Sequence, residues 1–263
     1  MPDKRKKTTR IAAVADIHCT KTSQGQFTDL FARANDMADV LLLGGDLTDY
    51  GLPEEAHVLA KEMSAARIPV LGVLGNHDYE SGKQDEITQI LCDAGMIVLD
   101  GDAHEVAGVG FAGAKGFCGG FGRGTLAPWG EDMVKRFVQE AIDEALKLEK
   151  AVARLRTPER VVLLHYAPVQ ATVEGEPPEI FPFLGTSRLE EPLGRHSVTA
   201  VFHGHAHRGT FEGRSTTGIP VYNVSLPLVR RQFPDGPPFY VLEVEAAAVP
   251  VDTPQEAGAM ANA

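Results

Sequence analysis

Short apolar runs alternate with amphipathic segments along most of the chain. Five runs consist mainly of Val, Ile, Leu, Ala and Gly, and they span residues 11–17, 40–45, 69–75, 161–167 and 199–204. The segments QFTDLFARANDMA, PEEAHVLAKEMSAAR and QDEITQILCDAG place apolar residues three or four positions apart, which is the period of an amphipathic helix. Near-continuous apolar strands separated by helices predict an α/β protein whose sheet is covered on both faces.

The middle and the end of the chain show a different pattern. IVLD, HEVAG and VGFAGAK predict further strands, and an apolar stripe predicts a helix from Glu131 to Arg154. TFEGRS, IPVYNVS and FYVLEVE predict antiparallel strands. No internal repeat or linker divides this core. We therefore expect a basic flexible leader over residues 1–10, a single domain over residues 11–248 and a flexible tail over residues 249–263.

Composition narrows the class of protein. The chain has 263 residues, 43% of them hydrophobic, which suffices for a sizeable core. Its apolar runs are far shorter than the roughly 20 residues that cross a bilayer. Its three cysteines share no CxxC spacing, so we expect neither a disulfide framework nor a zinc knuckle, and a cytoplasmic location. The net charge of −11 disfavours nucleic acid and anionic membranes as partners.

Polar residues follow each of the five apolar runs. They are Asp16 and His18, Asp46, Asn76 with His77 and Asp78, His165, and the three histidines of FHGHAH, His203, His205 and His207. In an open α/β sheet the carboxyl ends of the strands share one edge, so these side chains are expected to gather there. A single histidine at such a place is usually a hydrogen-bonded core or rim residue. A cluster of this size is costly to bury without a cation, so it predicts a metal site.

Two histidines of FHGHAH are the predicted ligands in that segment. Gly204 lets the backbone turn at the strand end, so that His205 and His207 can both point at metal. His203 lies inside the apolar run and is predicted to be structural.

The motifs DIH, GGDLTD, GNHD, a lone histidine after an apolar strand, and GHAH occur in this order over residues 11–225. They resemble the five signature motifs of the calcineurin-like metallophosphoesterase superfamily. The resemblance implies a four-layer α/β/β/α sandwich of two mixed sheets flanked by helices, with two metal ions. It implies that one metal ion is bound by Asp16, His18, Asp46 and His207. The second metal's ligands are then Asp46, Asn76, His165 and His205, with Asp46 bridging.

The chemistry of this set supports hydrolysis of a phosphoester. Carboxylate, amide and imidazole ligands without thiolate favour two divalent or mixed-valence ions of Mn, Fe, Zn, Co or Ni. Two metals about 3.5–4 Å apart can share a bridging hydroxide and clamp phosphate oxygens during in-line displacement. We therefore expect a phosphohydrolase for a small phosphodiester or phosphomonoester, with the diester favoured. His77 is the candidate to protonate the leaving oxygen, and Asp78 the candidate to orient its ring.

The substrate is less well defined by the sequence. GDLTDYGLPEE resembles the branch that contains cyclic-nucleotide phosphodiesterases, but Tyr79-Glu80 stands where that branch often carries an arginine two residues after GNHD. In residues 113–130, Lys115 and Arg123 either bind phosphate beside base-stacking aromatic residues, or belong to a solvated loop whose aromatic residues pack on the core. Residues 174–185 are another candidate rim of the site.

Other functions remain as alternatives. A nuclease of the same superfamily fits the motifs, but the acidic charge and the lack of a basic stripe disfavour it. A catalytically silent scaffold with the same fold should lack a ligand or the histidine of GNHD, and none is missing. Asp49 either hydrogen-bonds a ligand or caps the helix expected near Pro53, and we favour the cap. The sequence leaves the oligomeric state open.

Overall fold

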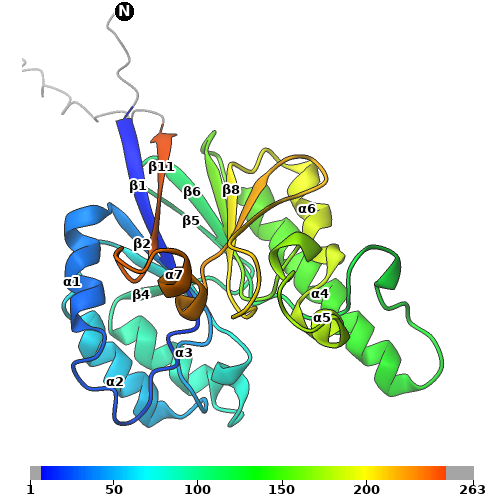
Figure 1. The fold of residues 1–263 in the computed structure, drawn as a ribbon, viewed down its shortest axis with the longest axis horizontal. Coiled ribbons are helices and arrows are strands. Elements are labelled where there is room, and N and C mark those ends of the chain that lie inside the picture. The colour runs from blue at the N-terminus through cyan, green and yellow to red at the C-terminus, as the bar shows by residue number, and fades with distance from the viewer. Residues whose placement is uncertain (1–6, 247–263) are drawn as a thin grey trace, which may run out of the picture.

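Two mixed β-sheets lie face to face in the structure, a computed structural model that describes residues 7–246 (Figure 1). The first sheet has the strand order β11 (Tyr240–Ala246), β1 (Lys7–Val14), β2 (Val40–Gly44), β3 (Val70–Val73) and β4 (Met96–Val98). The second has the order β5 (Asp102–Val106), β6 (Val109–Gly113), β7 (Arg160–Leu163), β8 (Ala200–His203), β10 (Pro220–Asn223) and β9 (Glu212–Arg214). The strands β11, β5 and β9 at the edges are antiparallel to their neighbours, and the remaining pairs are parallel.

Helices cover the outer face of each sheet, which completes four layers. The first sheet carries α1 (Thr28–Met37), α2 (Pro53–Met63) and α3 (Gln84–Asp93). The second carries α4 (Asp132–Arg154) and α6 (Glu190–Arg195). Smaller helices lie in the loops: α5 (Phe181–Leu184), α7 (Leu226–Gln232), η1 (His77–Tyr79), η2 (Gly122–Gly124), η3 (Gln170–Thr172), η4 (Pro178–Ile180) and η5 (Ser187–Leu189). The predicted α/β sandwich of two mixed sheets flanked by helices is confirmed.

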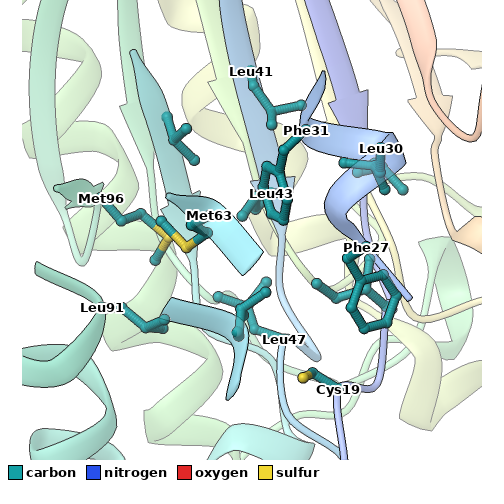
Figure 2. Packing of buried hydrophobic residues seen from close by; sticks show 14 of the residues in the cluster. Cys19, Phe27, Leu30, Phe31, Leu41, Leu43, Leu47, Met63, Leu91 and Met96 are labelled. Atoms are coloured by element: carbon teal, nitrogen blue, oxygen red, sulfur yellow. The ribbon is translucent and has the colours of Figure 1, made fainter. Parts of the chain in front are cut away.

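Alternate side chains of a strand point to opposite faces, so an apolar run forms a strand with two apolar faces. In β2, Leu41 and Leu43 pack under the helices, whereas their neighbours on the strand pack between the two sheets. Figure 2 shows both leucines among Phe31, Met63 and Leu91, which come from α1, α2 and α3. Burial on both faces explains why these strands are apolar at nearly every position.

One prediction about an individual segment needs correction. Strand β1 begins at Lys7, inside residues 1–10 that we predicted as a leader, and Lys7 to Arg10 pair with β11. The predicted strand IPVYNVS corresponds to β10, which is antiparallel to β9 as expected and parallel to β8 on its other side. Gly218, at a φ of +86°, is in the turn between β9 and β10, so β10 regains the direction of β8. Residues 1–6 and the predicted tail lie outside the described residues.

The topology brings the polar strand ends to one edge. The parallel strands β1, β2 and β3 of the first sheet and β7 and β8 of the second all lead into predicted ligand segments. The two sheets also meet there through hydrogen bonds, such as that from the ring of His165 to the carbonyl of Gly44 at 3.0 Å. None of the helices between residues 7 and 246 combines the length and apolar composition needed to span a membrane.

Candidate metal centre

The predicted ligands gather in two neighbouring groups. Asp16, His18 and His207 form one, and Asp46, His165 and His205 form the other, with the ligand atoms of each group within 4.8 Å of one another. Figure 1 shows that the strands leading to them converge where the two sheets meet. The structure therefore brings residues from distant segments into one site, as the strand-end pattern predicted.

The carboxylate of Asp46, a member of the second group, also reaches toward His18 of the first. Its Oδ1 is 3.4 Å from Nε2 of His165, and its Oδ2 is 3.8 Å from Nε2 of His18. Each oxygen thus faces a different group of imidazoles. A carboxylate in this position can donate one oxygen to each of two metal ions.

Asn76 and His165 present two acceptor atoms to each other. Nδ1 of His165 donates to the carbonyl of Gly44, because a carbonyl can only accept, so Nε2 is the ring nitrogen that can bind a metal ion. That Nε2 lies 2.9 Å from Oδ1 of Asn76, which is also an acceptor. Two lone pairs at this distance are satisfied by a cation that both of them bind.

His18 and His205 show the same arrangement of one bonded nitrogen and one available nitrogen. His18 directs Nδ1 to the carboxylate of Asp49 at 3.1 Å, and its buried Nε2 has no hydrogen-bond partner among the described residues. His205 donates from Nε2 to the carbonyl of Phe183 at 3.1 Å, which leaves the lone pair on Nδ1. Outer hydrogen bonds of this kind fix the tautomer of metal-binding histidines. The donor atoms therefore fit metal ions.

The backbone at the site is held in an uncommon conformation. Within residues 7–246, five non-glycine residues have positive φ, and four of them are predicted ligands: Asp16, His18, Asp46 and His205. Such conformations cost about 1–3 kcal/mol each and concentrate at functional sites. Close approach adds a constraint at Gly75, where a Cβ would lie 2.2 Å from the backbone nitrogen of Asp46.

Burial keeps two of the predicted imidazole ligands, His18 and His205, ready to bind metal. Burial lowers the pKa of His18, and it lowers that of His205 to about 3, so both rings are neutral near pH 7. Burial raises the pKa of Asp16, but the hydrogen bond from His207 and nearby imidazoles outweigh it, so this pKa is below its ordinary value. The same hydrogen bond raises the pKa of His207. Metal binding at His207 therefore competes with a proton.

His77 lies beside the predicted ligands but belongs to neither of the two groups of three described above. Its ring packs edge-on against His18, with centroids 4.6 Å apart, and its Nδ1 donates to the carbonyl of Asp49 at 2.6 Å. Burial lowers the pKa of His77, but this hydrogen bond and nearby carboxylates outweigh it and raise the pKa. His77 is therefore suited to hold a proton on Nε2.

The prediction that Asp78 orients the ring of His77 is wrong. The fully buried carboxylate of Asp78 accepts hydrogen bonds from the backbone of Leu47, Thr48 and Gly75, and from the Thr48 hydroxyl at 2.6 Å. It thus ties the loop after β2 to the loop after β3, while the carbonyl of Asp49 orients His77. Burial raises the pKa of Asp78 despite these bonds.

Asp78→Asn is expected to destabilise the metal-free protein by about 2 kcal/mol, because the amide brings an N–H donor against backbone N–H groups that lose their acceptor. The melting temperature should fall by about 2–4 °C for each kcal/mol. Thermal unfolding measures this, with Asp93→Asn on the exposed end of α3 as the control. An unchanged melting temperature in Asp78→Asn would show that Asp78 does not hold the loops.

Asp49 hydrogen-bonds a predicted ligand and does not cap α2. Its carboxylate contacts His18 at 3.1 Å, whereas α2 starts at Pro53 with Leu52 as N-cap. The carboxylate of Glu55 accepts from the backbone of Tyr50 and Leu52 at this helix start. The favoured interpretation of Asp49 is thus replaced by its alternative. Its position three residues after Asp46 was the only sequence signal for this role.

Asp49→Ala is expected to weaken metal binding by about 10–100-fold, the usual cost of losing a group that orients a metal-binding histidine. Metal titration of the chelator-stripped protein measures the change. Asp49→Asn, which keeps an acceptor oxygen for His18, should lose less affinity than Asp49→Ala. Equal affinity in Asp49→Ala and the unaltered protein would remove Asp49 from the site.

The two candidate substrate loops differ in their relation to the site. In residues 113–130, Lys115 is buried, its ammonium lies 5.0–5.4 Å from three aromatic ring centroids, and burial lowers its pKa. Phe117 and Phe121 pack into the core, whereas Trp129 is 60% exposed, so the packed alternative holds for the two phenylalanines only. In residues 174–185, the carbonyl of Phe183 accepts from His205, while its side chain is 59% exposed. This second loop borders the metal centre.

Carboxylate, amide and imidazole donors thus gather at the shared edge of two stacked sheets, where they could hold metal ions. The sequence profile of the calcineurin-like phosphoesterase family matches residues 9–209, and the chain belongs to this family. It is therefore a metal-dependent phosphoesterase. No curated protein matches the chain.

Several solved structures share this fold. Phosphopantetheinyl hydrolase (PptH) from Mycobacterium tuberculosis has a TM-score of 0.65 and 13% identity, covering 98% of this chain and 100% of that chain. Purple acid phosphatase PPD1 from seeds of yellow lupin (Lupinus luteus) has a TM-score of 0.53 and 12% identity, covering 84% of this chain and 44% of that one. The protein TT1561 of Thermus thermophilus has a TM-score of 0.52 and 14% identity, covering 91% of this chain and 99% of that one.

Proposed function

We propose that the protein hydrolyses a small phosphodiester by in-line attack of water at a centre of two metal ions. The observation that carries this proposal is the position of Asp46, whose two oxygens face different groups of imidazoles at 3.4 and 3.8 Å. The first ion would be held by Asp16, His18, Asp46 and His207, and the second by Asp46, Asn76, His165 and His205. The donor set suits Mn, Fe, Zn, Co or Ni.

The roles of the side chains follow from their hydrogen bonds. Two bound ions lower the pKa of a shared water and neutralise charge on phosphate oxygens. Asp49 and the carbonyls of Gly44 and Phe183 hold three ligand rings by their outer nitrogens, so that the opposite nitrogens face the centre. His77 donates from Nδ1 to the carbonyl of Asp49, so the proton available to the leaving oxygen is the one on Nε2.

Charge favours a diester over a monoester as the substrate. A phosphomonoester carries about 1.5–2 negative charges at pH 7, whereas a diester carries one. The chain has a net charge of −11, and Lys115 lies buried among aromatic rings away from solvent. Outside the metal centre, where the ions do not offset the charge of the protein, a substrate with the smaller charge therefore meets less repulsion.

The proposal includes one catalytic domain and a cytoplasmic location. The two sheets share a single apolar layer between them, which supports one domain. The three cysteines, Cys19, Cys92 and Cys118, are all free, as is usual in a reducing compartment. Burial raises the pKa of Cys19 to about 12, so this thiol next to His18 is structural.

The test is hydrolysis of bis(p-nitrophenyl) phosphate and p-nitrophenyl phosphate by chelator-stripped protein, with each metal added back. We expect no turnover without metal, restored turnover with at least one transition metal, and a higher kcat/KM for the diester. Turnover that persists after metal removal would contradict the metal centre. A higher kcat/KM for the monoester would contradict only the choice of substrate. Bound metal without turnover of either compound would favour an enzyme of narrow specificity or the scaffold.

A further inference from the structure

Asn223, at the end of β10, is a buried polar side chain to which the proposed reaction assigns no role. The residue has 0% exposure, and its amide is fully engaged with backbone. Nδ2 donates to the carbonyl of Ala206 at 2.7 Å and to that of Thr172 at 3.3 Å. Oδ1 accepts from the backbone nitrogen of Ser225 at 3.2 Å. A buried amide satisfied on both sides fixes the segments that it joins.

The shorter of these bonds reaches the turn between two predicted ligands. Ala206 stands between His205 and His207, and its carbonyl also accepts from the backbone nitrogen of Gly209. His205 has a φ of +70°, which a non-glycine residue adopts only when its surroundings hold it there. The Asn223 amide is part of those surroundings, because it holds the carbonyl of Ala206, in the peptide that joins Ala206 to His207.

The residues after Asn223 are joined to a third predicted ligand. Ala15 donates its backbone N–H to the carbonyl of Val224 at 2.9 Å and accepts from the backbone of Leu226 at 2.8 Å. Ala15 directly precedes Asp16, whose carboxylate accepts from the backbone nitrogen of His205. Asn223 thus stands at a junction between the segment of Asp16 and the turn of His205 and His207.

We propose that Asn223 is a positioning residue for the metal centre, acting through the carbonyl of Ala206. This inference rests on the proposed function. The amide fixes the turn that aims His205 and His207, and it couples this turn to the segment that presents Asp16. An aspartate in its place has nearly the same shape but offers no donor, so its oxygens would face the carbonyls of Ala206 and Thr172. The turn would then move away, and both imidazoles would leave their places.

The experiment is calorimetric titration of Zn²⁺ into chelator-stripped protein for the unaltered chain and for Asn223→Asp, with thermal unfolding of each metal-free protein. Asn35→Asp is a matched control, because Asn35 makes the same kinds of bond, from Nδ2 to the carbonyl of Ala65 and from the backbone of Arg67 to Oδ1. Asn35 joins α1 to the segment after α2, on the outer face of the first sheet.

We expect Asn223→Asp to bind Zn²⁺ about 10–100-fold more weakly, the range for groups that orient metal-binding histidines, while Asn35→Asp binds as the unaltered protein does. The expected gain in melting temperature on adding Zn²⁺ should shrink in parallel. Unchanged affinity in folded Asn223→Asp, even with a lower metal-free melting temperature, would overturn the inference and leave Asn223 a structural residue.

Two further outcomes separate the inference from the proposed function. If Asn223→Asp does not fold, Asn223→Ala provides the test, because it removes the donor without adding repulsion, and the same loss of affinity is expected. Full affinity in that variant would overturn the positioning role. If the unaltered protein binds no metal at all, the proposed function fails first, since there is then no centre to position.

Discussion

Asp46→Ala is expected to lower kcat/KM for bis(p-nitrophenyl) phosphate by more than about 100-fold, beyond the usual cost of losing a group that only orients a ligand. The physical reason is that this carboxylate faces both groups of imidazoles, so its removal weakens the binding of both ions. Metal content after dialysis and steady-state kinetics at saturating metal measure the two effects. The metal-free variant should remain folded.

The control for this variant is another carboxylate that pairs with a charge far from the centre. Asp102→Ala removes an exposed carboxylate on β5 that pairs with Arg154 at 2.9 Å. A surface pair contributes at most about 1 kcal/mol to stability, so activity and metal content should stay at the level of the unaltered protein. If Asp46→Ala retained full activity, the assignment of Asp46 to the metal centre would be refuted.

His77→Ala is expected to lower kcat for a diester with an alkoxide leaving group by about 100-fold or more, while both metals stay bound. The ring touches His18 edge-on and is not among the seven ligands that the family motifs imply, although it also forms a possible metal-binding group with His18 and Asp49. We expect its loss to remove a proton donor and to leave both ions in place. The loss should be smaller with p-nitrophenolate, a weakly basic leaving group that needs little protonation. Kinetics with both leaving groups, together with metal analysis, measure these effects.

This dependence on the leaving group separates proton donation from a merely structural role. His57→Ala, on the exposed side of α2, is the matched control and should change neither rate. Equal losses for both leaving groups in His77→Ala would contradict the role of His77 as the acid. A variant that had also lost metal would show instead that His77 supports the ligands.

The sequence was sufficient to predict the layers of the fold and the place of the site. Strands such as β2 are apolar on both faces because helices cover one side and a second sheet covers the other, and this burial is visible as an uninterrupted apolar run. The predicted ligands follow such runs directly. Parallel strands bring Asp16 and Asp46 to one edge of the first sheet, and the second sheet packed against it brings His165 to the same place.

The sequence was not sufficient to define the hydrogen bonds around the ligands. Asp49 and Asp78 lie on different loops, and their roles depend on which backbone groups each loop turns inward. His77 is oriented by the backbone carbonyl of Asp49, and every residue has such a carbonyl, so the sequence does not indicate this contact. Asn223 was missed because, in the sequence, an asparagine at a strand end looks like any turn residue. Its role depends on the distant segments that it contacts, and these are known only from the structure.

The predicted boundary of β1 failed, and the neighbour of β10 was not predicted, for a related reason. Lys7 to Arg10 are polar or charged, yet they pair with β11 because an edge of the first sheet needs a partner strand from the other end of the chain. In the second sheet β10 lies between β9 and β8, and its parallel pairing with β8 joins segments that are not consecutive in the sequence. Both features are set by distant segments, whereas periodicity reports only on neighbours in sequence.

The central claim is that Asp46 joins two metal ions into one centre. The most direct measurement is electron paramagnetic resonance of chelator-stripped protein titrated with Mn²⁺. We predict an exchange-coupled signal that is complete at two equivalents and absent from Asp46→Ala. A spectrum of isolated Mn²⁺ ions at every ratio, or saturation at one equivalent, would contradict the claim.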